Sequence, residues 1–549
     1  MAYAAHDIID TFFLGLVQAT FAQEKVIIIG AGISGLAAGK ALQESGYEAV
    51  ILEARDRVGG RIWTDRSTGK PLDLGASWIH AITGNPITAL AKKINTPLSG
   101  LVDYDDISAF DANGTEDPIT SAQYQQFTDV FAQFAASVTA SNANASVQDV
   151  VDAAVSQGAL NGFSTAALDS IINTVKEHEY AGDASELSQI GTEEGMDMGG
   201  GDVLFPDGFD AITNFLAIGL NIQTETIVET ISYTETGVTL STNKGEYRGD
   251  RVIVTVPLGV LKAGDIAFSP TLPSDKLSAI SALGSGVLNK VWLEFPSVFW
   301  DNTTMHNYFS KPKGHFNEWV NWHKTTGNMH LLGFNAGQYG LEIESKSDEE
   351  IVAEAMVILR TMWGEDIPEP INKVITRWNS DPFAKGAYSF IKVGSTIEDR
   401  ATLAKSVSNR VFFAGEATST DNAATTNGAY NTGLREAQKI SELAPITTET
   451  NTAGAFNTST SQLVLPRLKV VEQYYKLTLS LVDPAKLIFQ VAGAELLQGT
   501  GFTAAGFDTT TGTLKLPLVN VGAAKYNLEM TLIADSNPIQ FQLSKVSVL

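Results

Sequence analysis

The clearest pattern of apolar positions near the start of the chain is the uninterrupted run Val26–Ile29, which a glycine-rich stretch follows at once. An apolar run of this kind predicts a parallel strand that is buried on both faces. A second apolar run, Ala49–Leu52, ends at the acidic Glu53. Strand, glycine-rich turn, helix and second strand together predict a β-α-β unit at the start of an α/β domain.

The pattern changes twice further along the chain. From about residue 101 to 200 it is mostly helical, and the stretch Ala166–Tyr180 is amphipathic. It then alternates between strands and helices. The predicted elements here are strands at Thr226–Tyr233, Val238–Ser241, Tyr247–Val256 and Val287–Phe295, and a helix near Glu349–Trp363.

The end of the chain has a third pattern. Residues 447–460 are rich in Ser, Thr, Asn and Gly, which predicts a linker. Short alternating strands separated by turn residues follow, as is typical of an all-β module. Its composition resembles the β-sandwich appendages of exported bacterial proteins. The predicted strands are Lys476–Val482, Leu487–Val491, Thr513–Leu518, Tyr526–Leu532 and Ile539–Val546.

The glycine-rich stretch has the spacing of a dinucleotide-binding turn. Gly30, Gly32 and Gly35 form G-x-G-x-x-G, in which the glycines permit a tight turn, close approach to a pyrophosphate and close helix packing. The amides at the N-terminus of the following helix favour phosphate. Glu53 stands at about the 20-residue offset of a carboxylate that accepts ribose hydroxyls. The unit therefore predicts a dinucleotide site.

Three segments indicate which dinucleotide is bound. Glu53–Arg61 resembles the E-A-R-x-R-x-G-G-R segment of the flavin-containing amine oxidases. Asp73–Ile87 looks like the polyamine and spermine oxidase branch of that family, and Phe412–Ala437 resembles the family's last FAD segment. The resemblance extends from Glu24 to Leu443 and implies an FAD enzyme.

The resemblance also implies the fold class. We expect an α/β protein in which a Rossmann-like FAD-binding domain is interleaved with an α+β substrate domain, followed by the C-terminal β-sandwich-like module. The expected parts are the N-terminal segment 1–23, the FAD-binding parts 24–100, 201–265 and 376–446, the substrate-domain parts 101–200 and 266–375, the linker 447–460 and the module 461–549.

The residues that would contact FAD follow from the resemblance. An arginine of the segment Glu53–Arg61 would neutralise pyrophosphate charge, and Val228 would contact adenine through its backbone. Thr425 and Thr426 begin a helix that would face the flavin pyrimidine end, where negative charge develops on reduction. The implied set is Gly30, Gly32, Ser34, Gly35, Glu53, Arg55, Gly60, Arg61, Gly75, Ala76, Ser77, Trp78, Val228, Trp378, Gly415, Glu416, Thr425, Thr426 and Ala429.

Two residues are candidates for catalysis. Lys290 lies in an otherwise apolar predicted strand, where a buried lysine is costly without a partner. In the resembling family this lysine reaches flavin N5 through a water, and a cation there would help oxygen accept electrons. His80 matches a histidine that lines the substrate channel and would hydrogen-bond the amine. The alternatives are a solvent-facing edge lysine and a structural histidine.

Three further residues are candidates for binding substrate. Glu179 matches a position where a carboxylate can meet a distal ammonium, although a solvated helix face explains it as well. Trp378 and Tyr388 match the aromatic walls of the substrate cavity, which suit an amine. The family's second aromatic wall would fall at Asn422, which is not aromatic. That departure argues against strict polyamine specificity.

Composition narrows the chemistry. The chain has no cysteine, which excludes disulfides, thiol catalysis and a cysteinyl-flavin thioether, so non-covalent FAD is expected. Its net charge of −25 disfavours nucleic acid and favours cationic ligands, although it also aids solubility. No metal site is predicted, and no apolar run reaches the length of a membrane helix.

The N-terminus bears on location. Thr11–Ala22 has the length of the apolar region of a signal peptide, whereas Met1–Asp10 has two aspartates and no Lys or Arg, unlike a signal n-region. A start site further upstream and an amphipathic helix are the alternatives. Together with the β module, the segment favours a periplasmic or secreted protein over a cytoplasmic one.

The predicted function is oxidation of a polyamine or related amine to an imine, with hydride transfer to flavin N5 and reduction of O2 to H2O2. One alternative is an L-amino-acid oxidase, but that branch typically has an arginine at the position of Trp78 to clamp the substrate carboxylate. Another is a surface-binding protein whose β module binds glycan or a partner. The lack of a coiled-coil insertion and the acidic charge disfavour histone demethylation.

Overall fold

The computed structural model describes residues 24–548 apart from 117–120, 143, 194–197, 444–453, 458–459, 471–472, 498–504, 509–510, 522–523, 535 and 537. The predicted signal segment and most of the predicted linker lie outside the described residues. The chain divides into two compact units, residues 25–438 and the C-terminal residues from 439 onward, which are described separately.

A five-stranded parallel sheet begins the larger unit. Its strand order is β21-β12-β1-β2-β8, and residues 26–28 of the central strand are fully buried, as the apolar run predicts. Strands that are far apart in the sequence thus form one sheet. They are β1 (Lys25–Ile29), β2 (Glu48–Leu52), β8 (Asn221–Gln223), β12 (Arg251–Val254) and β21 (Val411–Phe413).

Helix α2 (Ile33–Glu44) packs very close to β1, and glycine makes this approach possible. A Cβ atom added to Gly35 would lie 2.0 Å from the carbonyl oxygen of Gly30. Gly30 itself has a φ of +102°, a conformation that side chains strongly disfavour. The glycine spacing therefore has the structural consequence that the sequence predicts.

A six-stranded, mostly antiparallel sheet forms a second layer of the larger unit. Its order is β19-β15-β18-β17-β16-β6, so the strand that carries Lys290 is interior and is not an edge. The edge-lysine alternative is thereby wrong. The strands are β6 (Ile107–Phe110), β15 (Leu288–Glu294), β16 (Met305–Tyr308), β17 (Glu318–Asn321), β18 (His330–Ala336) and β19 (Asn372–Ile375).

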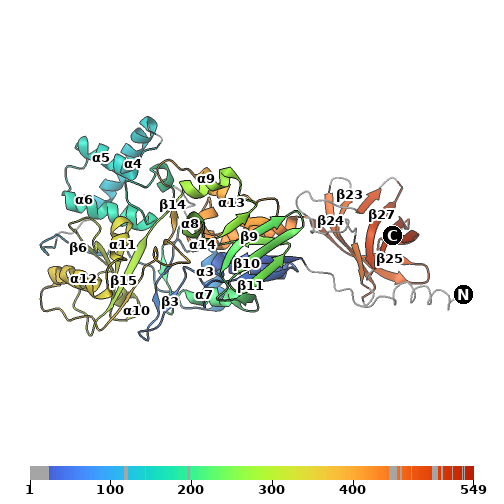
Figure 1. Cartoon of the computed structure of the whole chain (residues 1–549), viewed down its shortest axis with the longest axis horizontal. Coiled ribbons are helices and arrows are strands. Elements are labelled where there is room, and N and C mark those ends of the chain that lie inside the picture. Colours follow the sequence, from blue (N-terminus) through green and yellow to red (C-terminus); the bar gives the residue numbers. More distant parts are fainter. Residues whose placement is uncertain are drawn as a thin grey trace. The chain divides into compact units, whose positions relative to one another are not determined.

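A helical group lies beside this sheet (Figure 1). It contains α4 (Ser121–Ser141), α5 (Val147–Ser156) and α6 (Thr165–Ile172). The amphipathic stretch predicted as one helix is α6 followed by the π-helical turn η1 (Asn173–His178). Such a turn rotates the residues after it relative to a regular helix, and π turns are frequent at functional sites.

A four-stranded sheet of the larger unit has the order β11-β10-β9-β13. The single strand predicted at Tyr247–Val256 is in fact two strands, β11 and β12, which belong to different sheets. A bend at Asp250 separates them, and the carboxylate of that residue accepts a hydrogen bond from the amide of Lys25 at 2.8 Å. The strands of this sheet are β9 (Val228–Thr234), β10 (Gly237–Thr242), β11 (Gly245–Gly249) and β13 (Ala267–Ser269).

Further elements of the larger unit connect these layers. The helices are α3 (Pro86–Ile94), α7 (Asp210–Ala217), α8 (Leu258–Ala263), α9 (Ser274–Ala282), α10 (Trp322–Thr326), α11 (Gly337–Ile343), α12 (Asp348–Trp363), α13 (Ile397–Ala404) and α14 (Thr426–Glu442), with short 3-10 turns η2 (Ile190–Glu193) and η3 (Glu416–Thr418). The short strands are β3 (Thr64–Asp65), β4 (Leu72–Asp73), β5 (Trp78–Ile79), β7 (Val203–Leu204), β14 (Gly284–Ser285) and β20 (Ser389–Phe390).

The C-terminal unit is all-β, but it is a single sheet rather than the two sheets of a sandwich. The order β22-β23-β24-β25-β29-β28-β27-β26 closes on itself through β22–β27 and β23–β26 pairs, which removes open edges. β22 falls within the predicted linker. The strands are β22 (Gly454–Asn457), β23 (Gln462–Val470), β24 (Gln473–Asp483), β25 (Ile488–Leu497), β26 (Ala505–Asp508), β27 (Thr513–Val521), β28 (Ala524–Leu532) and β29 (Gln540–Val548).

In the part of the chain that the structure describes, no helix has both the length and the apolar character needed to cross a membrane.

Candidate active site

A cavity of about 1190 Å³ is lined by residues of both the parallel sheet and the six-stranded sheet. Every predicted cofactor residue except Gly35 lines it, and so do His80, Lys290, Glu179 and Tyr388. The tertiary structure therefore gathers residues that are hundreds of positions apart in the sequence around one space. This volume is larger than that of an ordinary ligand site and suits a dinucleotide together with a substrate.

Glu53 lies at the carboxyl end of β2, where it borders the cavity. Its carboxylate accepts hydrogen bonds from the backbone amides of Ala31 (2.7 Å) and Arg55 (2.8 Å). These bonds hold a buried carboxylate in place beside the glycine turn. The Arg55 guanidinium forms a bidentate pair with Asp381, with distances of 2.9 and 2.7 Å.

A second buried carboxylate, Glu416, is held by cations at another wall of the cavity. Arg61 donates to it at 2.9 Å, and the Ser389 hydroxyl donates at 2.6 Å. Arg400 in turn donates to the Ser389 hydroxyl at 2.7 Å. Burial by itself would raise the pKa of Glu416, but the charges of Arg61 and Arg400 hold it below its ordinary value. Glu416 is therefore an ionised acceptor.

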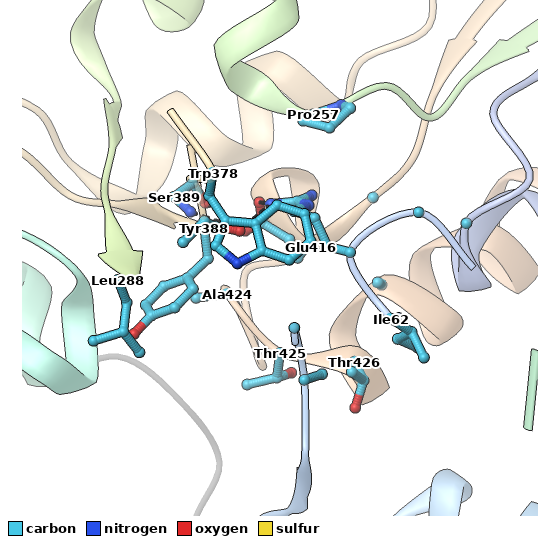
Figure 2. A pocket seen from close by; sticks show the side chains of 18 of the residues that line it. Ile62, Pro257, Leu288, Trp378, Tyr388, Ser389, Glu416, Ala424, Thr425 and Thr426 are labelled. Carbon is cyan, nitrogen blue, oxygen red and sulfur yellow. Dashed lines mark hydrogen bonds and ion pairs between the residues drawn. The ribbon is translucent and has the colours of Figure 1, made fainter. Parts of the chain in front are cut away.

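Two helix N-termini border the same cavity. Helix α2 starts after Gly32 without a side-chain cap, and the buried Ser34 hydroxyl has no hydrogen-bond partner among the described residues. Helix α14 starts at Thr426, and the Thr425 hydroxyl accepts from the amide of Gly428 at 3.0 Å. Figure 2 shows Thr425 and Thr426 across the cavity from Trp378. The uncapped amides of α2, the Ser34 hydroxyl and the glycine turn fit the phosphates of FAD, and the N-terminus of α14 fits its ring.

Lys290 is 4% exposed, and three oxygen atoms surround its ammonium. It donates to the carbonyls of Asp73 (2.9 Å) and Gly75 (2.6 Å) and to the hydroxyl of Ser77 (2.5 Å). It also lies 5.4 Å from the centre of the Trp78 ring. These acceptors are the partners that a buried lysine requires.

The charge of Lys290 depends on burial and on one carboxylate. Burial lowers the pKa of Lys290 to about 7, while the charge of Asp73 raises it. Burial likewise raises the pKa of Asp73 to about 7, against hydrogen bonds from Thr64 and the amide of Phe209. Two groups that titrate near neutrality thus lie together beside the cavity, as is common at functional sites.

Aromatic side chains form walls of the cavity. The buried Trp378 donates to the carbonyl of Leu74 at 3.3 Å, and the Tyr388 hydroxyl donates to the carbonyl of His178. Asn422 also lines the cavity, so this position of the wall is polar. Trp378 and Tyr388 both line the cavity (Figure 2).

His80 is held by a residue that the motifs do not reveal. Its Nδ1 donates to the Asp202 carboxylate at 2.7 Å, and the Tyr104 hydroxyl donates to the same oxygen at 2.9 Å. Burial would lower the pKa of His80, but the hydrogen bond to Asp202 and the charge of Glu179 raise it above its ordinary value. The ring also stacks on Trp78, with centroids 6.5 Å apart.

Glu179 follows the π-helical turn and is exposed, yet it lines the cavity. Its charge acts on both His80 and Tyr388, so it lies near the aromatic wall. Sequence reasoning missed Asp73 as a partner of Lys290, and also missed Tyr104, Asp202, Glu318 and Asn307 as cavity residues. Asp73 lies inside a recognised segment, but the others have no local signal, because only strand pairing and loop packing bring them to the cavity.

A glycine turn, a buried carboxylate and two helix N-termini, facing a lysine and aromatic walls, define a dinucleotide-dependent oxidoreductase. The model of the flavin-containing amine oxidoreductase family matches residues 33–441, and the chain belongs to this family. The family resemblance expected from the three segments is therefore confirmed, and the protein is a flavin-dependent amine oxidase.

Several relatives are similar over most of the larger unit. Polyamine oxidase 4 of Oryza sativa subsp. japonica is 33% identical over 439 residues, covering 75% of this chain and 88% of that protein. Lysine-specific histone demethylase 1 homolog 3 of Arabidopsis thaliana is 34% identical over 490 residues, covering 77% of this chain but only 30% of that protein. A solved structure of wild-type putrescine oxidase bound to putrescine matches this chain with a TM-score of 0.63 at 20% identity, and the match covers 76% of this chain and 99% of that one. At this identity the likeness shows a shared fold and nothing more.

Proposed function

We propose that the protein oxidises a polyamine or related amine to an imine, with non-covalent FAD as cofactor and O2 as electron acceptor. The observation that supports this most is the set of carboxylates on the substrate side of the cavity, Glu179, Asp202 and Glu318. Such a wall favours a cation. When bound, FAD would supply the hydride acceptor for oxidation of the amine and the electrons that reduce O2 to H2O2.

The residues of this chain would prepare the substrate for that chemistry. Trp78, Trp378 and Tyr388 exclude water from the reacting carbon. His80, held through Nδ1 by Asp202, presents its other ring nitrogen to the amine. Lys290 supplies a positive charge beside the cavity wall, where it would stabilise negative charge on reduced oxygen.

The L-amino-acid oxidase alternative is weaker for two reasons. Trp78 cannot pair with a carboxylate, and three of the cations that line the cavity are engaged with carboxylates already: Arg55 with Asp381, Arg61 with Glu416, and Lys385 with Asp265. The ammonium of Lys290 is held by two carbonyls and a hydroxyl. A substrate carboxylate beside Trp78 would therefore be desolvated without the bidentate arginine partner of that branch, which costs several kcal/mol. The demethylase relatives do not change this conclusion, because the chain covers only part of their length.

The decisive experiment is an assay of peroxide release by the purified protein. We expect a yellow protein whose flavin is released on acid or heat denaturation and which oxidises diamines and polyamines. Faster turnover of leucine or phenylalanine than of any polyamine, compared as kcat/KM, would contradict the proposal. Flavin that stays attached to the denatured chain would contradict the non-covalent part.

We also propose a periplasmic or secreted location, supported by the apolar segment 11–22 and the separate β module. Expression of the full chain with an epitope tag, followed by cell fractionation, tests it, and recovery only in the cytoplasm would contradict it. A glycan or surface partner for the closed sheet stays a prediction.

A further inference from the structure

The C-terminal unit contains one sequence repeat twice. Residues 456–466 read FNTSTSQLVLP, and residues 507–517, which lie 51 positions further on, read FDTTTGTLKLP. The strands follow the same order in each copy, β22–β25 in the first half (residues 454–497) and β26–β29 in the second half (residues 505–548). Similarity at a fixed offset is typical of a repeated structural unit. The C-terminal unit is therefore a duplication of one four-stranded half.

The first turns of the two halves are closed by the same hydrogen bond. Between β22 and β23, the amide of Thr460 donates to the side chain of Asn457 at 3.2 Å. Between β26 and β27, the amide of Thr511 donates to the side chain of Asp508 at 3.2 Å. An Asn or Asp side chain that accepts from a nearby amide fixes the local backbone. The repeat thus preserves local geometry as well as sequence.

An irregularity in strand pairing also recurs at the same offset. The pairing of β23 with β24 shifts register between Leu465 and Leu468, and the pairing of β27 with β28 shifts register between Leu516 and Val519. Each shift includes a proline of its half. Proline cannot donate to a strand ladder and is tolerated at such bulges. The two halves therefore share one fold in detail.

The halves meet through contacts that are the same from either side. Phe489 of β25 lies directly opposite Phe541 of β29, and these are equivalent residues of the two halves. β22 pairs with β27, and β26 pairs with β23 in the same parallel manner. A contact in which each partner offers the same surface to the other is isologous, the kind that joins two identical chains. The first half therefore binds the second as one subunit binds another in a twofold dimer.

The duplication preserves the core of the unit and not its outer surface. Val464 and Gly493 of the first half correspond to Lys515 and Lys545 of the second, so outer positions have diverged. The buried residues correspond closely: Leu463, Leu465, Leu477, Leu479 and Phe489 match Leu514, Leu516, Leu528, Met530 and Phe541. This pattern argues against two equivalent ligand sites and in favour of a duplicated pairing surface.

The joins between the halves are shorter than the ladders inside them. β25 and β29 pair over three residues, 488–490 with 540–542. Inside the first half, β24 and β25 pair along nearly their whole length, from Tyr474 opposite Leu497 to Asp483 opposite Ile488. Segments of a structure that make few contacts open before the rest. A join between halves should therefore open before a half unfolds.

We propose that the C-terminal unit links two copies of this chain by exchange of halves, so that the first half of one copy closes with the second half of the other. The exchange rebuilds every strand pair of the closed sheet, so its cost is mainly the freedom lost on association. Within the described residues the closed sheet offers no free strand edge, so a second copy can pair with it only in this way. The linked form becomes more populated as the chain concentration rises.

The test uses disulfides, because the chain has no cysteine of its own. Gln490 and Gln540 lie directly opposite across the β25–β29 join, and their side chains are 3.3 Å apart. In the full chain, Gln490→Cys/Gln540→Cys should form a disulfide, which shows that the two positions pair. Two differently tagged full chains, one with Gln490→Cys and one with Gln540→Cys, are then co-expressed, purified and oxidised.

Exchange of halves should give a disulfide between the two different chains. This heterodimer should exceed either homodimer by about 10-fold, because an isologous join brings position 490 of one copy only to position 540 of the other. Random collision of thiols would give homodimers and heterodimers in comparable amounts. In the matched control Lys515→Cys replaces Gln540→Cys, since Lys515 is exposed and lies three strands from β25 in the sheet, and no excess of heterodimer is expected.

Heterodimers that do not exceed the homodimers would overturn the exchange of halves, and a double variant that forms no disulfide would overturn the β25–β29 join itself. If a variant does not fold, as judged by thermal unfolding, Ile488→Cys and Gln542→Cys take its place, because they form another pair of the same join. The outcome does not depend on the proposed amine oxidation, since residues 25–438 are unaltered in every variant.

Discussion

The ammonium nitrogen of Lys290 lies 2.5 Å from the hydroxyl oxygen of Ser77. This contact joins an interior strand of the six-stranded sheet to the segment that carries Trp78, and it places the positive charge of that strand at the cavity wall. A lysine held by three oxygen acceptors is oriented as well as buried, so its charge has a defined position relative to the cofactor residues.

Replacing Lys290 with methionine keeps the length of the side chain and removes the charge. We expect flavin reoxidation by O2 to slow by roughly 10-fold or more, equivalent to ~1.4 kcal/mol of lost barrier stabilisation. FAD binding should persist, because the residues that border the glycine turn are unchanged. Stopped-flow mixing of the reduced enzyme with O2 measures the effect.

A second buried lysine provides the control. Lys276 in α9 donates to the carbonyl of Leu403 at 2.7 Å and does not line the cavity. Lys276→Met should lower thermal stability without changing reoxidation. If Lys290→Met and Lys276→Met reoxidise alike, Lys290 has no part in the oxygen reaction.

The pH dependence of reoxidation follows from the direction of the pKa shift. Burial lowers the pKa of Lys290 to about 7, so its charge is present below that pH and is lost as pH rises through it. Reoxidation should therefore slow as pH rises through neutrality. Lys290→Arg, which stays charged, should remove this step. A wild-type rate that is constant or rises across neutrality would count against the charge as the active feature.

Asp202 should set the pH at which His80 titrates. Its hydrogen bond contributes to the raised pKa of His80, so Asp202→Asn should lower that pKa and move the acidic limb of kcat/KM to lower pH. Tyr104→Phe keeps the carboxylate and should move the limb much less. Asp207→Asn is the control, since Asp207 does not line the cavity. An unmoved limb in Asp202→Asn would mean that His80 does not control the profile.

Glu179 should contribute to binding of charged substrates. Glu179→Gln removes an exposed carboxylate, so KM for spermidine or spermine should rise by about 2- to 5-fold, the scale of a screened charge interaction, and KM for a simple monoamine should rise less. Glu186, which lies seven positions on and pairs with Lys392 away from the cavity, supplies the control variant Glu186→Gln. Identical KM changes for both classes of amine would assign Glu179 to a solvated helix face.

Local pattern was enough to predict the features that depend on neighbours in the sequence. The apolar run before Gly30, the glycine spacing and the acid at Glu53 predict a strand, a tight turn and a cofactor carboxylate, because each depends only on residues within one β-α-β unit. The same holds for Lys290, whose charge stands out inside an apolar run. These signals also sufficed to identify the family.

Only the tertiary structure decided what surrounds the substrate. Glu318 and Asn307 lie on the same face of the six-stranded sheet as Lys290, because β15, β18, β17 and β16 pair in one register. A shift of one residue in that register would turn their side chains to the other face. Asp202 reaches His80 across 122 positions of sequence. The closure of the C-terminal sheet likewise depends on the pairing of distant strands. Its strands would show the same alternation of apolar and polar residues in an open sheet as in a closed one, so the alternation alone does not predict closure. Pairing and register join distant residues, and no local pattern of the chain encodes them by itself.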